Sequence, residues 1–150
     1  MSYTYELVQV RTPEAWEAYH KIREAELFQG RSGKKYNPNN PDEHLSNNFP
    51  LLLKLNGRGI GTTRLDVRED GTAVVRLVAI TKNEQGKGHG RVLQERVEQL
   101  AREKGAKRLL TNAAPEAIGF YEKLGFVRDS WDPSELTGIA ETCIQMSKTL

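Results

Sequence analysis

Three glycines at alternate positions, Gly86, Gly88 and Gly90, make the segment NEQGKGHGRVL the strongest candidate for chemistry in the chain. Glycine has no Cβ atom, so several backbone N–H groups can approach a single ligand. A helical pattern follows at once, and the first turn of a helix adds unpaired N–H donors and the positive end of its dipole. Lys87 and Arg91 add positive charge. The segment therefore predicts an anion site, with phosphate as the usual anion.

Two nucleotide-binding motifs do not match this segment. A P-loop requires Ser or Thr directly after its lysine, but Lys87 is followed by Gly88. A dinucleotide fingerprint G-x-G-x-x-G that starts at Gly86 requires a third glycine where this chain has Arg91. The hairpins predicted before the segment also argue against a βαβ unit. The phosphate is therefore expected to belong to another class of ligand.

The letters QGKGHG match the pattern Q/R-x-x-G-x-G/A, with Gln85, Gly88 and Gly90 in its defining positions. Here the chain resembles the GNAT superfamily of acyl-CoA-dependent N-acetyltransferases. The strand LVAI, the long helix after the segment and the downstream NAAPEAIGFYEKLGF extend the resemblance over nearly the whole chain. It implies one GNAT domain over residues 1–150 with an α+β (mixed α/β) fold. A central, mostly antiparallel, twisted sheet of about seven strands would be flanked by about four helices.

The resemblance also implies how the co-substrate, acetyl-CoA, is held. Its pyrophosphate would lie on the amides of the glycine segment. The preceding strand would splay from its neighbour at a bulge and pair its backbone with the pantetheine amides. Asn112 matches a position that contacts cofactor or a bound water, whereas Phe120 is expected in the helix–sheet core. The implied cofactor-binding residues are Val78, Ala79, Ile80, Gln85, Gly86, Lys87, Gly88, His89, Gly90, Arg91, Asn112 and Tyr121.

Acetyl transfer from a thioester to an amine requires a deprotonated amine, a polarised carbonyl and a stabilised thiolate. Deprotonating an amine of pKa near 10 costs about 4 kcal/mol at neutral pH. Tyr121, in FYEKLGF, matches the tyrosine that GNAT enzymes often use as general acid; the alternative is a core tyrosine on an apolar stripe. A backbone N–H of the splayed strand, that of Ala79 or Ile80, is expected to polarise the carbonyl.

The general base is open. Many family members carry a glutamate on the strand before the glycine segment, but this strand reads VVRLVAI, with Arg76 and no carboxylate. Asp66 on the neighbouring strand and Glu26 on the first helix are the candidate bases. Each also fits a salt-bridged or solvated carboxylate, and a water chain is the third alternative.

The resemblance places the acceptor pocket among residues 16–28, 30–48 and 130–138, which carry no motif that identifies the acceptor. Arg23, Arg64 and Arg76 could line the pocket and favour a carboxylate-bearing amine, although ion-paired arginines fit equally well. A two-residue turn after the third strand would put Arg64 and Arg76 on opposite faces of the sheet.

The expected function is direct transfer of acetyl from acetyl-CoA to a primary amine of an unidentified acceptor, a small molecule. Transfer to a protein or peptide amine is one alternative. A non-catalytic acyl-CoA sensor on the same fold is another, because the strand glutamate is missing. A nucleotide- or nucleic-acid-binding protein built on the basic glycine segment is the third.

Sequence patterns predict the elements that position these residues. A strand at 5–10 precedes a helix capped by Thr12 that runs to Gly30, and a polar loop to residue 48 holds a short helical turn near 41–44. Asn56-Gly57 and Asp70-Gly71 predict two hairpins and thus three consecutive antiparallel strands. A helix ending at Gly105, the strand KRLLTNA, a short helix from Pro115 to Gly125 and the strand pair FVRDSW and IAETCIQMSK complete the chain.

Composition limits the partners. Twenty-two basic and 20 acidic residues leave a net charge of +2, so no overall field predicts nucleic-acid binding. A signal peptide and a membrane-length apolar run are both missing from the sequence, so we expect a cytoplasmic protein without a membrane partner. The lone Cys143 is expected as a small buried group of the last strand. His20, His44 and His89 lack metal-site spacing and are expected on the surface or in loops. The resemblance leaves a homodimer through the C-terminal strands open.

Overall fold

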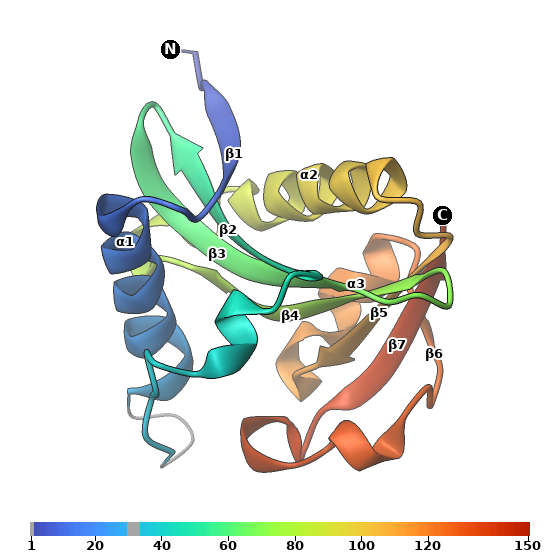
Figure 1. Cartoon of the computed structure of the whole chain (residues 1–150). Helices are drawn as coiled ribbons and strands as arrows, with labels where there is room; N and C mark the ends of the chain where they lie inside the picture. The colour runs from blue at the N-terminus through green and yellow to red at the C-terminus, as the bar shows by residue number, and fades with distance from the viewer. Residues whose placement is uncertain (1, 30–33) are drawn as a thin grey trace.

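A seven-stranded sheet forms the centre of the molecule, in the order β1-β2-β3-β4-β5-β7-β6 (Figure 1). The computed structural model describes residues 2–29 and 34–150. Neighbouring strands are antiparallel except β4 and β5, which are parallel. The predicted α+β class with a mostly antiparallel sheet is therefore confirmed. The strands are β1 (Tyr5–Gln9), β2 (Asn48–Leu55), β3 (Arg58–Val67), β4 (Thr72–Ile80), β5 (Arg108–Ala113), β6 (Val127–Arg128) and β7 (Ile144–Thr149).

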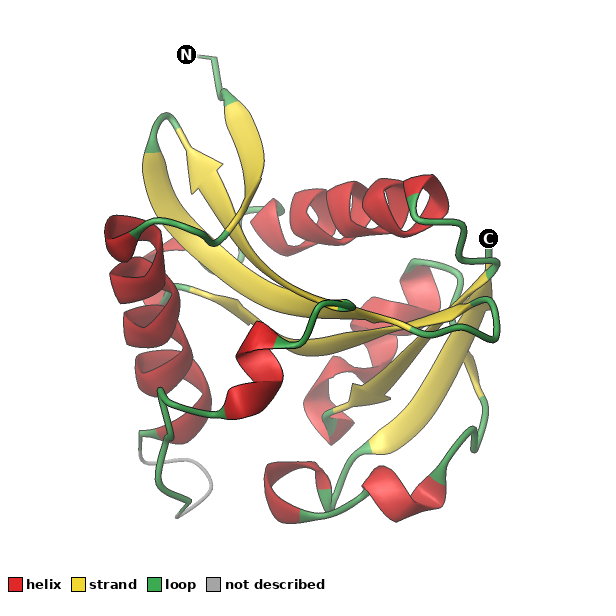
Figure 2. Ribbon diagram, viewed as in Figure 1, coloured by secondary structure: helices red, strands yellow, loops and turns green. Residues whose placement is uncertain are grey.

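Helices cover both faces of this sheet (Figure 2). The longer ones are α1 (Pro13–Arg23), which continues as a π turn over Glu24–Phe28, α2 (His89–Glu103) and α3 (Ile118–Lys123). Short 3-10 turns lie at Pro41–His44, Lys82–Glu84, Pro115–Ala117, Pro133–Glu135 and Gly138–Ala140. None of the helices in the described ranges is both long and apolar enough to cross a membrane.

The first helix begins as its sequence predicts. The Thr12 hydroxyl oxygen accepts a hydrogen bond from the Ala15 N–H at 3.2 Å, and Pro13 occupies the first turn, where its missing N–H removes nothing. The regular helix stops at Arg23 rather than running on to Gly30, because the chain widens into the π turn. Gly30 itself lies outside the described residues.

Two hairpins join β2, β3 and β4, and the second of them corrects an expectation. The Arg68 N–H donates to the Thr72 carbonyl, so three residues, not two, form the connection, with Gly71 at φ 84°. Adding one residue to a loop reverses which side chains share a face. Arg64 and Arg76 are therefore register partners on one face, and the prediction that they lie on opposite faces is wrong.

Alternation along β2 divides the core into two layers. Leu51 and Leu53 pack with Leu93 and Val97 of α2 on one face, whereas Leu52 packs with α1 on the other. The α2 layer also contains Tyr121 from α3, and the α1 layer contains Tyr19, Ile22 and Ala79. Each fully buried aliphatic side chain contributes about 1.5–3 kcal/mol. The sheet therefore packs against α1 on one face and against α2 and α3 on the other.

The C-terminal elements differ in extent from the prediction. Only Val127 and Arg128 of FVRDSW form a strand, which pairs with β7 as expected. The chain between β6 and β7 forms two 3-10 turns, so both strands are shorter than predicted. Cys143 directly precedes β7 and is only partly buried, so it is neither in the strand nor a core residue.

Candidate active site

The centre of the site is the place where β4 and β5 part. Their parallel pairing ends at Val75 and Thr111, whereas β4 continues to Ile80. The register between β3 and β4 shifts by one residue at the same level, where Leu77 adopts φ 55°. An extra residue with an unusual φ is the signature of a β-bulge, which bends a strand. The splay that the GNAT resemblance implies is thus present in β4.

Backbone alternation identifies which N–H of β4 faces the opening. The Thr81 N–H donates to the Ile60 carbonyl, and bonded pairs alternate along an antiparallel ladder, so Ala79 is the next residue whose N–H points to β3. Ile80 then turns its backbone away from β3. Its carbonyl accepts from the Gln85 side chain at 2.8 Å on that open side. Of the two expected donors, Ile80 is the one whose geometry fits.

The glycine segment forms a hollow beside this opening. Gly86 and Gly88 have φ of 76° and 87°, a backbone region that disfavours other residues, and Gly88 caps α2. A Cβ atom added at Gly90 would approach the Phe120 ring at 3.6 Å. The cavity over these residues measures about 390 Å³ and is also lined by Ile80, Gln85 and Arg91. Bare backbone, a helix start and a cation fit a pyrophosphate.

The predicted loop residues divide by where their side chains lie. Gln85 bonds the Ile80 carbonyl and lies 3.4 Å from Glu26. Arg91 and Lys87 are exposed, and Arg91 also forms an i,i+4 pair with Glu95. Only the backbone of His89 can face the cavity, because its ring is 1% exposed beneath the loop. The expectation of a surface histidine is therefore wrong at this position.

Glu26 supports the glycine segment from α1's π turn. Its carboxylate accepts from the Lys82 N–H at 3.1 Å and from the Gln85 side-chain amide. These contacts tie the carboxylate to the loop that follows β4. Leu27, its neighbour, lines the cavity at the splay, but Glu26 does not. The structure thus places one of the two candidate bases as a loop support.

Tyr121 lines a second cavity, which lies in the splay itself. This cavity measures about 310 Å³ and is bordered by Val78, Asn112 and Cys143 among others. Burial raises the pKa of Tyr121 to about 12, although a hydrogen bond with Thr111 acts in the opposite direction. The phenol therefore stays protonated and can donate a hydrogen bond into the cavity.

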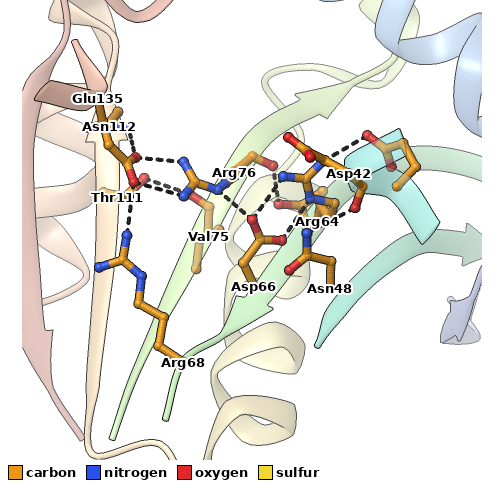
Figure 3. A network of polar contacts seen from close by, with 12 residues as sticks. Asp42, Asn48, Arg64, Asp66, Arg68, Val75, Arg76, Thr111, Asn112 and Glu135 are labelled. Atoms are coloured by element: carbon orange, nitrogen blue, oxygen red, sulfur yellow. Dashed lines mark hydrogen bonds and ion pairs between the residues drawn. The ribbon is translucent and has the colours of Figure 1, made fainter. Parts of the chain in front are cut away.

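A chain of alternating charges forms the other wall of the site (Figure 3). Asp66 receives two bonds from Arg64, at 2.7 and 2.8 Å, and one from Arg76 at 2.6 Å. Arg76 in turn forms a forked pair with Glu135, at 2.7 and 3.0 Å. Both arginines are ion-paired, which was one of the two alternatives that the sequence left open. Both oxygens of Asp66 are engaged by guanidinium groups.

Two carboxylates of this network escaped sequence reasoning. Glu43, 4% exposed, accepts from Tyr19, Arg23 and Arg64, and Glu135 accepts from Arg76 and Arg68 and from Asn112. Both lie in 3-10 turns within polar segments, so no periodic pattern marks them. A single glutamate two residues after Pro41 or Pro133 carries no sequence signal of its own.

Asn112 occupies the end of β5 as predicted, and its amide is already bonded. Its nitrogen donates to Glu135 at 3.2 Å, and its oxygen accepts from Gln145 at 2.9 Å. Asn112 also borders the splay cavity. The amide therefore links β5 to the charged wall and to β7.

The charged wall borders a third, open cavity of about 380 Å³, called here the polar cavity. Its lining consists of Asp42, Leu45, Asn48, Arg64, Asp66, Arg76 and Glu135. Arg76 and Glu135 also border the splay cavity, so the two spaces adjoin. The structure thus joins the splay cavity to the polar cavity, while the glycine hollow is lined by Ile80 at the end of the same strand, β4.

Comparisons with solved structures find the same fold in known proteins. An acyl-CoA N-acyltransferase from Pseudomonas aeruginosa is 21% identical with a TM-score of 0.79, over 99% of this chain and 100% of the other. A GNAT-family acetyltransferase from Staphylococcus aureus is 15% identical with a TM-score of 0.78, over 98% and 99%. The PaiA N-acetyltransferase from Thermoplasma acidophilum, solved with coenzyme A, is 15% identical with a TM-score of 0.71, over 100% of both chains. These likenesses show the fold.

The family itself is shown by a sequence model. The model described as "Acetyltransferase (GNAT) family" matches residues 4–126, which include the glycine segment and Tyr121. The fold, the splayed β4 and the glycine hollow agree with that match. The chain therefore belongs to the acetyltransferase (GNAT) family.

Proposed function

We propose that the chain is an N-acetyltransferase that moves an acetyl group from acetyl-CoA directly to a primary amine. One observation carries the proposal: the splay between β4 and β5 opens between the glycine hollow and the buried Tyr121. A long, amide-bearing thioester has a polar strand edge to lie along and a phosphate site at one end. Its reactive end then lies in the splay cavity.

In this proposal the chain's own groups act on the thioester and on the leaving thiol. The Ile80 N–H, turned to the open edge, donates to the thioester carbonyl oxygen as charge develops there. Tyr121 donates a hydrogen bond to the departing sulfur. Burial raises the pKa of Tyr121 to about 12, so the phenol is protonated at neutral pH and can give the departing sulfur a hydrogen bond or a proton.

The acceptor is proposed to enter through the polar cavity, because Arg76 and Glu135 border both it and the splay cavity. The volume of about 380 Å³ suits a small-molecule amine, and its open mouth leaves a peptide amine as the alternative. Asp66 is the candidate base that borders this space, and a water chain is the alternative because both Asp66 oxygens are engaged.

Thermal unfolding with acetyl-CoA, free CoA and ATP tests the co-substrate. A ligand at 100 times its dissociation constant stabilises a protein by about 2.7 kcal/mol. For a chain of this size each kcal/mol raises Tm by about 2–4 °C. We expect a shift of several degrees with acetyl-CoA and CoA and a smaller one with ATP. A flat response to both acetyl-CoA and CoA would overturn the proposal.

A non-catalytic acyl-CoA sensor is the second candidate, favoured by the lack of a carboxylate on β4 and by the engaged oxygens of Asp66. An amine panel with acetyl-CoA distinguishes the two. Turnover of any amine supports the enzyme, whereas a thermal shift without turnover across small amines and peptide N-termini supports the sensor. Binding of nucleic acid that weakens steeply with salt would instead support the third alternative.

A further inference from the structure

A fourth cavity, called here the outer cavity, adjoins the splay cavity. It measures about 350 Å³. Among the described residues, Leu27, Ala114, Ile139 and Cys143 border both the splay cavity and the outer cavity. None of the described residues that line the outer cavity also lines the polar cavity. Two separate spaces therefore adjoin the cavity in which the thioester would react.

The boundary between the splay cavity and the outer cavity is formed by apolar or weakly polar side chains. Leu27 comes from the π turn after α1, Ala114 directly follows β5, and Ile139 and Cys143 belong to the segment before β7. All four residues are only partly buried. Each therefore leaves apolar surface uncovered, and a hydrocarbon chain that lies across the boundary would remove this surface from water.

The charged residues that line the outer cavity are exposed to water. Among the described residues these are Lys34, Glu116 and Glu141, so charges of both signs are present and carboxylates outnumber cations. A chain that ends in a carboxylate gains no net electrostatic attraction from such a lining. An uncharged chain therefore fits the outer cavity better than a charged one.

We propose, on the basis of the function proposed above, that the protein also uses acyl-CoA donors with unbranched, uncharged acyl chains longer than acetyl, and that these chains extend from the splay cavity into the outer cavity. The acceptor amine still enters through the polar cavity, which the chain leaves free. Its nitrogen bonds to the carbonyl carbon, and the C–S bond breaks with its electron pair on sulfur. The proton that the amine loses balances the thiolate, so an amide and CoA result.

Calorimetric titration without an amine compares acetyl-CoA, butyryl-CoA, hexanoyl-CoA and succinyl-CoA. Each fully buried methylene is worth about fourfold in affinity. We expect the Kd of hexanoyl-CoA to be at least about tenfold lower than that of acetyl-CoA, because part of its longer chain is buried. Succinyl-CoA has as many acyl carbons as butyryl-CoA but should bind no more tightly than acetyl-CoA. Equal Kd values for acetyl-CoA and hexanoyl-CoA would overturn the inference, as would tighter binding of succinyl-CoA than of butyryl-CoA.

A variant at the boundary locates the chain. Ala114→Leu should raise the Kd of hexanoyl-CoA by about tenfold, because the larger side chain occupies the space between the two cavities. The Kd of acetyl-CoA should change less than about twofold, because acetyl is too short to cross the boundary. Ala25→Leu is the matched control: Ala25 is exposed and lines none of the four cavities, so both Kd values should stay as in the wild type.

The unmodified protein offers a second measurement at the same boundary, which does not depend on whether Ala114→Leu folds. Cys143 is the single cysteine of the chain, so alkylation by N-ethylmaleimide, followed by mass spectrometry, reports on this position alone. Saturating hexanoyl-CoA should slow the alkylation about fivefold more than saturating acetyl-CoA does, because its chain covers the thiol. Equal rates with the two ligands would show that the chain lies elsewhere and would overturn the inference.

Turnover separates this inference from the proposed function. With an amine that the protein accepts, kcat/KM should be about tenfold higher with hexanoyl-CoA than with acetyl-CoA. A preference for acetyl-CoA overturns the longer donor and leaves the acetyltransferase intact. The lack of any binding of CoA, acetyl-CoA and hexanoyl-CoA overturns both.

Discussion

At the scale of single residues, the site combines one hydrogen-bond donor, the Tyr121 hydroxyl, with carboxylates that already form hydrogen bonds or ion pairs. Tyr121 is buried and has a raised pKa, so it retains its proton at any physiological pH. Asp66 is held by two arginines, and Glu26 supports the loop after β4. The tyrosine is therefore the side chain whose removal should affect the chemical step most directly.

Replacing Tyr121 with Phe should lower kcat by about a hundredfold, because the thiolate loses its donor. The Kd for CoA, measured by calorimetry, should change less than twofold, because the ring still fills its place in the core. Steady-state rates with an accepted amine provide the test. An unchanged kcat would remove Tyr121 from the mechanism.

Glu26 and Asp66 should respond differently to removal of their charge. Glu26→Gln should raise the Kd for CoA by about threefold, since the loop loses a charge-assisted bond, while the pH profile of kcat stays the same.

Asp66→Asn should abolish the rise of kcat/KM with pH if Asp66 is the base. A wild-type profile in Asp66→Asn would instead assign the proton to a water chain.

At the scale of elements, the path from β4 to α2 depends on two unusual backbone regions. The bulge at Leu77 re-aims β4, and positive φ at Gly86 and Gly88 turns the chain sharply into the helix. Glycine reaches such angles at no steric cost, whereas an L-residue loses about 1–2 kcal/mol. A side chain at Gly86 or Gly88 is therefore expected to strain the backbone of the hollow.

Gly88→Ala should destabilise the protein by about 1 kcal/mol in urea unfolding and weaken CoA binding, although no atom lies within 4 Å of the added Cβ. Gly119→Ala is the matched control, because Gly119 is an exposed helical glycine with equally open space and no positive φ. It should stabilise the protein by up to about 1 kcal/mol. Equal effects of the two substitutions would contradict the strain argument.

At the scale of the whole molecule, a buried charged network joins α1, the 3-10 turn at Pro41–His44 and three strands. Burial opposes ionisation of Glu43, but Arg23, Tyr19 and Arg64 together hold its pKa below the ordinary 4.5. The pKa of Glu135 is likewise lowered, by Arg76, Asn112 and Arg68, against the effect of burial. These groups fasten the wall of the polar cavity to the sheet.

The free energy of unfolding should therefore fall as the pH is lowered into the acid range. A carboxyl whose folded pKa is lowered stabilises fully above its unfolded pKa, near 4.5, and loses that contribution as pH falls through the folded value. Glu43→Gln should cost about 3 kcal/mol at pH 7, because Arg23 and Arg64 lose a buried partner. The free energy of unfolding of the Glu43→Gln variant should also fall less steeply below pH 4.5 than that of the wild type, as measured by urea unfolding at several pH values.

Local residue preferences allowed much of the fold to be predicted from the sequence. Thr12, Pro13, Asn56-Gly57 and the glycine segment each determine a cap, a turn or a hollow through their own backbone preferences, and the alternating apolar residues of β2 determine its two faces. The hairpin after β3 was predicted, but its loop length was predicted wrongly, because Asp70-Gly71 allows loops of two or three residues and the packing of both strand faces selects between them.

Tertiary structure alone decided the rest of the site. Nothing near Asp66 in the sequence announces that Arg64 and Arg76 meet on one face, or that Glu43 and Glu135 join them, because these contacts span 10 to 59 positions of the chain. The burial of His89 against Tyr5 depends on a contact over 84 positions. Short-range backbone preferences therefore specify the shape of the glycine hollow, whereas the charged wall of the polar cavity is set by which distant segments the folded sheet brings together.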